Sequence, residues 1–197
     1  MKIYDISQEL FTCAVFPGDK PPVRDVVETI EGGSICNLTA LSMCAHNGTH
    51  VDAPYHFYKD GKTIDQIDLT KVIGKCYVSF ASGAVTKETA ISIIEKARAI
   101  DAEAARRILI GGDAYVTIEA ARVFNSEKVV LVGNESQTVG PLEAPAQVHY
   151  ELLGAEVVLL EGIRLNEVPE GVYLLNAAPI NLGQADGAPC RAVLIKE

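Results

Sequence analysis

The sequence lacks the features that membrane proteins and nucleic-acid-binding proteins need. No hydrophobic run approaches the roughly 18 residues of a membrane-spanning helix, and the N-terminal stretch MKIYDISQEL has no apolar core of the kind found in signal peptides. No basic patch is present, and the formal net charge of −9 disfavours binding to nucleic acids or anionic lipids, which carry phosphate groups. We therefore expect a cytoplasmic protein that binds neither nucleic acid nor membrane.

Cysteine is also scarce, and its spacing excludes the common cysteine-based sites. The five cysteines are an odd number and include no CxxC pair and no zinc-ribbon spacing. This pattern predicts reduced thiols in the core or on the surface. One alternative is a nucleophilic Cys44, which lies two residues before His46.

The rest of the composition is typical of one ordinary globular domain. A chain of 197 residues is long enough for one full hydrophobic core and short for two, and 48% hydrophobic with 22% charged residues indicates a folded protein. Predicted strands alternate with helices in the second half, whereas the first half is richer in strands and turns. We predict a single α/β domain over residues 1–197.

Hydrophobic periodicity and turn residues predict the elements of this domain. A hairpin is expected where strands at 26–30 and 35–44 are joined by a Gly-Gly-Ser turn. Helices are expected after threonine caps or at helical spacing of apolar residues, from residue 86 and over 117–124 and 143–154. The other predicted strands are apolar runs between turn residues, at 1–7, 72–81, 107–110, 128–133, 156–160, 171–175 and 190–195.

Histidine is rare too, but three of the four histidines lie within eleven residues, as His46-x3-His50-x-Asp52-x3-His56. Neutral imidazole and carboxylate suit zinc and related divalent ions, and a catalytic metal site needs several such ligands with one coordination position left open. A histidine-rich surface loop is the simpler alternative. Three histidines and an aspartate so close together favour the metal site.

The spacing leaves open whether His46 and His50 bind the same ion. In an extended strand both share a face with Asp52 but lie roughly 13 Å apart. A bend at the Asn-Gly dipeptide 47–48 would bring them together; otherwise two neighbouring metals would be bridged by Asp52. Pro54 excludes a regular helix here, and with it the helical HExxH zinc motif.

Two further candidates lie in the second half of the chain. Glu161 directly follows an apolar run, where a carboxylate is unusual unless it is paired or metal-bound, although it could equally be solvated at a strand end. His149 lies in the predicted helix 143–154 and could be an ordinary core or capping histidine. The residues alone leave both roles open.

Four blocks of this sequence resemble the cyclase family of metal-dependent hydrolases, whose enzymes include bacterial kynurenine formamidases, with isatin hydrolases as relatives. Residues 46–57 match the motif HxGTHxDxPxHF at every fixed position. The other blocks are PGD at 17–19, HYELLGAEVVLLEGI at 149–163 and DGAPCRAVL at 186–194. The resemblance implies a swivelling β/β/α fold with a mixed sheet, assembled as a homodimer or homotetramer with active sites near subunit contacts.

The resemblance also implies a role for each candidate residue. The family's metal ligands correspond to His46, His50, Asp52, His149 and Glu161. The last histidine of the motif, His56, corresponds to the general acid/base, whereas the residues alone would also allow a further metal ligand or a residue that orients one. The ligand set suits zinc, manganese or iron; we expect zinc, with manganese as the alternative, and one or two ions per subunit.

One loop departs from the family pattern. Formamidases carry a pattern resembling GxDxxSxDP after a buried strand, where this chain has GNESQTVGP at 133–141. Glu135 and Gly140 thus replace aspartates, and Thr138 replaces a serine. Because this loop is expected to line the pocket, the changes bear on the substrate more than on the metal chemistry.

The predicted activity is metal-assisted hydrolysis of an aryl formamide such as N-formylkynurenine, in tryptophan catabolism. A bound ion lowers the pKa of water towards ~7 and polarises the carbonyl, and His56 transfers the proton. An aromatic substrate is consistent with Phe16, Tyr55, Phe57 and Tyr58 near the motif. The alternatives are an isatin hydrolase-like or other cyclic amide or lactone hydrolase, a cyclisation enzyme, and a metal- or ligand-binding homologue without turnover.

Overall fold

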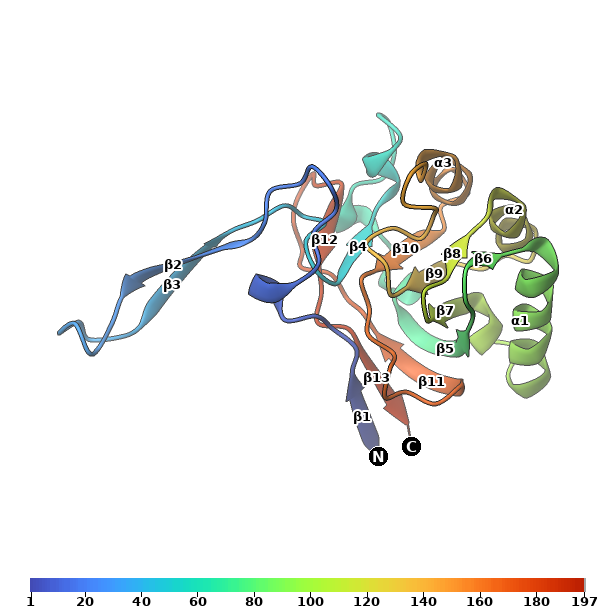
Figure 1. Ribbon diagram of the computed structural model, residues 1–197, viewed down its shortest axis with the longest axis horizontal. Coiled ribbons are helices and arrows are strands. Elements are labelled where there is room, and N and C mark those ends of the chain that lie inside the picture. The colour runs from blue at the N-terminus through green and yellow to red at the C-terminus, as the bar shows by residue number, and fades with distance from the viewer. Residues whose placement is uncertain (197) are drawn as a thin grey trace.

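A curled mixed sheet dominates the computed structural model, which describes residues 1–196 (Figure 1). Within these residues nine strands pair in the order β1-β13-β11-β5-β7-β9-β10-β4-β12. The central strands run parallel: β5 (Ile73–Phe80), β7 (Arg107–Gly111), β9 (Leu131–Asn134) and β10 (Val158–Glu161). The flanking strands pair antiparallel: β1 (Lys2–Asp5), β13 (Val193–Lys196), β11 (Gly171–Asn176), β4 (His50–Asp52) and β12 (Gly187–Pro189).

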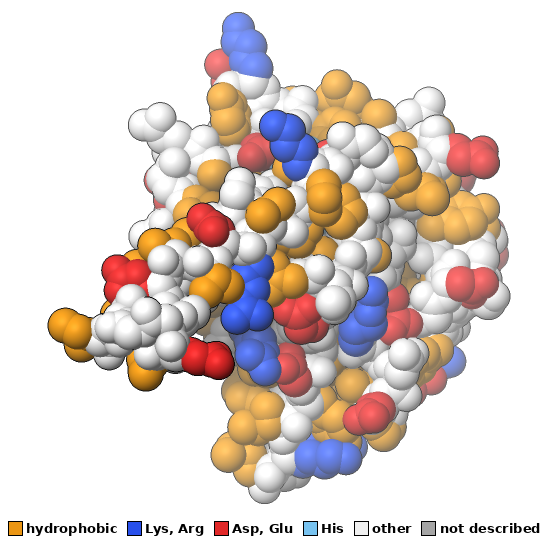
Figure 2. Space-filling view, turned by 60° about the vertical axis from the view of Figure 1, so that its left-hand side comes forward, with side chains coloured by type: hydrophobic (Ala, Val, Ile, Leu, Met, Phe, Trp, Pro, Cys, Tyr) orange, Lys and Arg blue, Asp and Glu red, His pale blue; other side chains and the backbone are white. Residues whose placement is uncertain are grey.

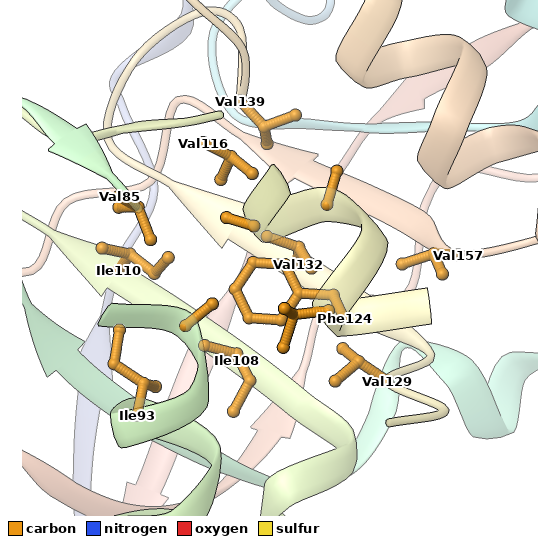
Figure 3. Packing of buried hydrophobic residues seen from close by; sticks show 14 of the residues in the cluster. Val85, Ile93, Ile108, Ile110, Val116, Phe124, Val129, Val132, Val139 and Val157 are labelled. Atoms are coloured by element: carbon orange, nitrogen blue, oxygen red, sulfur yellow. The ribbon is translucent and has the colours of Figure 1, made fainter. Parts of the chain in front are cut away.

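Helices cover one face of this sheet. They are α1 (Lys87–Ile100), α2 (Ile118–Ser126) and α3 (Ala146–Gly154). The side chains of Thr86 and Thr117 cap the first two helices by accepting hydrogen bonds from backbone N–H groups, as the sequence predicts. Phe124 of α2 lies at the centre of the resulting core and packs against strand residues such as Ile108 and Val132 (Figure 3).

The opposite face of the sheet closes around a second core. Val51 of β4, Leu160 of β10 and Leu194 of β13 all belong to it. Because β4 and β13 lie near opposite ends of the strand order, the sheet must curl for their side chains to share one core. The predicted α/β fold with a mixed sheet is therefore confirmed.

Along β4 and β10, successive side chains point to opposite faces of the sheet, and this decides which of them face the helices. Val51 and Leu160 point into the curled core, so His50, Asp52 and Glu161 point to the opposite face, towards α3. In the antiparallel pairing of β4 and β10, Glu161 lies directly opposite His50. The polar candidates thus gather where the sheet meets α3.

A hairpin of β2 (Val23–Glu28) and β3 (Leu38–Ser42) projects from the body as an arm (Figure 1). Every residue of both strands is exposed. Apolar side chains lie on the arm and beside its base (Figure 2). A small parallel pair, β6 (Ala84–Val85) and β8 (Tyr115–Val116), and five short 3-10 helices complete the described chain: η1 (Leu10–Thr12), η2 (Pro54–His56), η3 (Ile64–Gln66), η4 (Leu69–Lys71) and η5 (Ala104–Arg106).

The predicted helices and strands are all present, with boundaries shifted by a few residues. The sequence did not reveal the short strands β4, β6, β8 and β12, whose pairing partners lie far along the chain. Among the described helices, none combines the length and the apolar character that a membrane crossing requires.

Candidate metal centre

A tight turn before β4 brings His46 and His50 together. The backbone N–H of Asn47 donates to the carbonyl of Cys44 at 3.2 Å, and Gly48 has a φ of +67°, in the left-handed region that favours glycine. The ring centroids of His46 and His50 are only 5.0 Å apart. The bend expected at the Asn-Gly dipeptide is therefore present.

Five predicted ligand side chains converge behind this turn. Asp52 Oδ1 lies 2.8 Å from His46 Nδ1 and 3.3 Å from His50 Nε2. Glu161 places one carboxylate oxygen 3.4 Å from His50 Nε2 and the other 3.1 Å from His149 Nε2. His149 Nε2 is also 3.6 Å from Asp52 Oδ2. Residues from β4, its preceding turn, β10 and α3 thus form one cluster.

The cluster divides into two groups that share Asp52. One group is His46, His50 and Asp52; the other is Asp52, His149 and Glu161, and within each the ligand atoms lie within 4.8 Å of one another. Asp52 presents Oδ1 to the first group and Oδ2 to His149 of the second. Ligands held about 2.0–2.2 Å from one ion stand roughly 3–3.5 Å apart, so the observed spacings fit one ion or two ions bridged by Asp52.

The hydrogen bonds of the cluster also fit a cation. His50 Nε2 and Asp52 Oδ2 are buried and have no hydrogen-bond partner among the described residues. This is unusual because an unpaired buried polar group costs about 1–3 kcal/mol. Nδ1–H of His50 donates to the Gly48 carbonyl, and Nδ1–H of His149 donates to the Pro145 carbonyl, each at 3.0 Å. These bonds leave both Nε2 atoms as ligand nitrogens.

The charges in the cluster also favour the binding of a cation. Burial opposes ionisation of Asp52, but His46 and His50 hold its pKa well below the usual range. Burial and the charge of Asp52 oppose ionisation of Glu161, yet the hydrogen bond from His149 and the nearby imidazole of His50 lower its pKa. Burial likewise opposes protonation of His46, but Asp52 and Asp186 raise its pKa to about 11. Protons on the imidazoles balance the carboxylates, and a divalent cation would replace that positive charge.

A cavity of about 240 Å³ opens beside the cluster, and His56 lies on its wall. The ring of Phe57 stacks on His149 at 4.8 Å between centroids. The cavity is lined by Phe16, Asp19, His46, His50, His56, Phe57, Gln137, Thr138, Pro145, His149 and Glu161. Cys44, the alternative nucleophile, is not part of this lining.

Two of the four aromatic residues expected near the substrate lie elsewhere. Phe16 and Phe57 line the cavity, whereas Tyr55 and Tyr58 do not. The hydroxyl of Tyr58 donates to the carbonyl of Tyr150 at 2.7 Å, because this side chain packs against α3. The apolar walls of the cavity therefore come from two phenylalanines.

The loop 133–141 lines the cavity only in part. Gln137 and Thr138 are in the lining, and the buried Thr138 hydroxyl has no hydrogen-bond partner within residues 1–196. Glu135 points away: its carboxylate accepts hydrogen bonds from the backbone N–H groups of Gly112 at 2.5 Å and Leu165 at 2.8 Å. The expectation that the change at Glu135 alters the pocket was wrong, because this side chain joins two loops.

Asp186 is the residue of the site that the sequence analysis missed. Its Oδ2 lies 2.9 Å from Nε2 of His46 and 3.1 Å from Nδ1 of His56. The only signal for it was its position at the start of the matched block 186–194.

Comparisons with known proteins agree with the resemblance to the cyclase family that the sequence motifs show. Residues 4–141 match the family model described as "Putative cyclase". A kynurenine formamidase from Geobacillus thermodenitrificans is 35% identical over 209 residues, which cover 98% of this chain and 96% of that protein. A solved structure of a potential metal-dependent hydrolase with cyclase activity is 27% identical, with a TM-score of 0.79 over 98% of this chain and 96% of the other. Isatin hydrolase A from Labrenzia aggregata, bound to benzyl benzoate, shares the fold with a TM-score of 0.82 at 21% identity, over 100% and 94% of the two chains.

Proposed function

Because this chain belongs to the cyclase family, we propose that it is a metal-dependent amidohydrolase that cleaves an aryl formamide such as N-formylkynurenine. Hydrolysis of a non-peptide C–N bond is the activity that its curated relatives support. The observation that carries the proposal is the convergence of three imidazoles and two carboxylates beside a cavity that has a further histidine on its wall.

The five clustered side chains are the ligands in this proposal. A divalent ion would be held by His46, His50, Asp52, His149 and Glu161. We expect zinc, with manganese as the alternative, and one or two ions per subunit. When bound, such an ion polarises the formyl carbonyl and activates water for attack.

His56 moves the proton in this reaction. Its Nδ1 faces Asp186, which leaves Nε2 to accept a proton from the attacking water and to return it to the departing aryl amine. The water oxygen forms a bond to the formyl carbon and the C–N bond breaks, which gives formate and the amine. Phe16 and Phe57 offer apolar surface for the aromatic ring, and the unpaired Thr138 hydroxyl offers a hydrogen bond to the substrate.

An assay of the purified protein tests this function. Formate release should be measured with N-formylkynurenine and formanilide as substrates, and ring opening with isatin, after chelation and after addition of zinc or manganese. We expect metal-dependent release of formate from N-formylkynurenine. Turnover of isatin alone would favour the cyclic-amide alternative, and a fully metal-loaded protein without turnover of any substrate would favour a binding protein.

We also propose that the chain forms a homodimer in which the arm packs against a second copy, with a homotetramer as the alternative. An isolated two-stranded hairpin is marginally stable in water, yet Val26, Ile35 and Leu38 are exposed on or beside its strands, Ile35 completely. Light scattering should give a dimer for the wild type and a smaller mass for Ile35→Asp combined with Leu38→Asp. The cytoplasmic location and the role in tryptophan catabolism stay predictions.

A further inference from the structure

Asp186 directly precedes β12, and its backbone is held in place although its side chain is half exposed. Its carbonyl accepts a hydrogen bond from the backbone N–H of Ala53 at 2.9 Å. The next residue, Gly187, pairs with Asp52 in the register of β12 and β4. The backbone that carries Asp186 is therefore held by the same strand that carries the metal-ligand candidate Asp52.

One function of this carboxylate follows from comparison of the three clustered histidines. His50 and His149 each donate one ring N–H to a backbone carbonyl, which fixes the ring and aims the other nitrogen at the cluster. His46 has no such carbonyl among the described contacts. Its Nε2 faces Asp186 Oδ2 at 2.9 Å, while its Nδ1 faces Asp52.

The same oxygen of Asp186 also contacts the histidine on the cavity wall. Nδ1 of His56 lies 3.1 Å from it, and the rings of His56 and His46 are tilted by 31° with their centroids 4.0 Å apart. A carboxylate oxygen accepts hydrogen bonds, so both facing nitrogens carry protons. Nδ1 of His46 faces Asp52 Oδ1 in the same way, at 2.8 Å, so a metal ion would displace the proton there, whereas Nε2 of His56 is left for the cavity.

We propose that Asp186 is a positioning residue that sets the tautomer and orientation of both His46 and His56, and so couples the metal centre to the group that transfers the proton. The part concerning His56 rests on the proposed function, whereas the part concerning His46 requires only that the cluster binds a divalent ion. In zinc-loaded protein, Asp186 holds the two rings against each other through one shared oxygen.

His46, His56 and Asp186 could also be taken as a third metal-ligating group, since their ligand atoms lie within 4.8 Å of one another. The side chains of His56 and Asp186 are 29% and 41% exposed, whereas the side chains of the other two groups, apart from His46, are at most 4% exposed. Oδ2 of Asp186 is hydrogen-bonded to both imidazoles, unlike the unpaired Oδ2 of Asp52. The geometry therefore favours positioning, and the metal content of a variant separates the two readings.

The test compares Asp186→Asn, Asp186→Glu and the control Asp65→Asn. Asp65 accepts a hydrogen bond from the backbone N–H of Gln184 at 3.0 Å, so the control perturbs the same loop and no histidine. Zinc affinity should be measured by competition with a chromophoric chelator and zinc content by elemental analysis. For Asp186→Asn we expect affinity to fall by about 10–100-fold with unchanged stoichiometry, partial recovery in Asp186→Glu and no change in the control.

Nitrogen-15 NMR of the zinc-loaded protein, labelled at histidine, provides the direct readout. In the wild type, His56 should carry its proton on Nδ1, and in Asp186→Asn the signal should move to the Nε2–H form that free imidazole side chains prefer. If formamidase activity is found, kcat of Asp186→Asn should fall by about 10-fold or more while KM changes by less than about 3-fold, because substrate contacts are unchanged.

Three results would overturn the proposal. Loss of one zinc per subunit in Asp186→Asn would make Asp186 a ligand, and unchanged zinc affinity would refute its action on His46. An unchanged His56 tautomer would refute its action on that residue. A wild type without turnover would refute the proposed function alone, because affinity and tautomers are measured without substrate.

Discussion

A β-carbon on residue 187 would lie 2.7 Å from Cε1 of His46, so the ring of this ligand candidate occupies space that only a glycine at position 187 leaves open. Gly187→Ala should therefore displace His46 and lower zinc affinity by about 10-fold or more, although no ligand is removed. Chelator competition measures the effect. Gly183→Ala is the matched control, because a β-carbon there meets no atom of the described chain within 4 Å. Equal affinities of the two variants would contradict the prediction.

Replacement of Asp52 and replacement of His56 should have different effects on metal content. His56→Ala should keep its metal and lose about 10²–10⁴-fold in kcat, the usual contribution of a general acid/base. Asp52→Ala should lose both metal and turnover, since Asp52 contacts both halves of the cluster. Elemental analysis and formate release separate the cases, and a His56→Ala protein purified without metal would refute the assignment of His56.

Asp19 should contribute to the choice of substrate. Apart from the ligand candidate Glu161, it provides the one carboxylate in the described lining of the cavity, which includes no lysine or arginine. A carboxylate can bind the α-ammonium group of N-formylkynurenine, and a hydrogen bond to a charged group contributes about 1.5–3 kcal/mol. Asp19→Asn should raise KM for N-formylkynurenine by about 10-fold and leave KM for formanilide unchanged. Equal changes for both substrates would exclude this contact.

Cys76 should make the protein less stable at alkaline pH. Burial in β5 raises the pKa of its thiol from 9.0 to about 12. Between these values the unfolded chain loses the proton and the folded protein keeps it, so the free energy of unfolding decreases as pH rises above 9, by up to about 1.4 kcal/mol per pH unit.

Urea unfolding of the metal-free protein between pH 8 and about pH 11 measures this slope. Cys76→Ala should be less stable at pH 8 because it leaves a cavity, but its stability should fall less steeply with pH. Cys36→Ala, at an exposed cysteine of the arm, is the control. The same slope in wild type and Cys76→Ala would show that this thiol does not titrate with unfolding.

The features that could be predicted best from the sequence are those that short stretches of chain determine. The caps at Thr86 and Thr117 and the turn before His50 depend on neighbouring residues, and all three are present. The helices and most strands were found for the same reason, since their periodicity and end signals are local.

The site was harder to predict because the pairing of distant strands brings its residues together. That Glu161 lies opposite His50 depends on the pairing of β10 with β4, two strands more than a hundred residues apart in the chain, which no local pattern specifies. Before the family resemblance was considered, Glu161 and His149 could not be assigned. Asp186 was not predicted because a single aspartate in a loop carries no periodic signal. Glu135 was wrongly expected to line the pocket because the direction of a loop side chain cannot be read from the sequence.

Strand β13 lies between β1 and β11, so residues at the two ends of the chain are hydrogen-bonded neighbours (Figure 1). During synthesis on the ribosome, β1 must therefore wait for Val193–Lys196 to emerge before it can join the sheet. A nascent chain stalled before residue 193 would expose β1 and the edge of β11 to other strands, which makes early termination a route to aggregation.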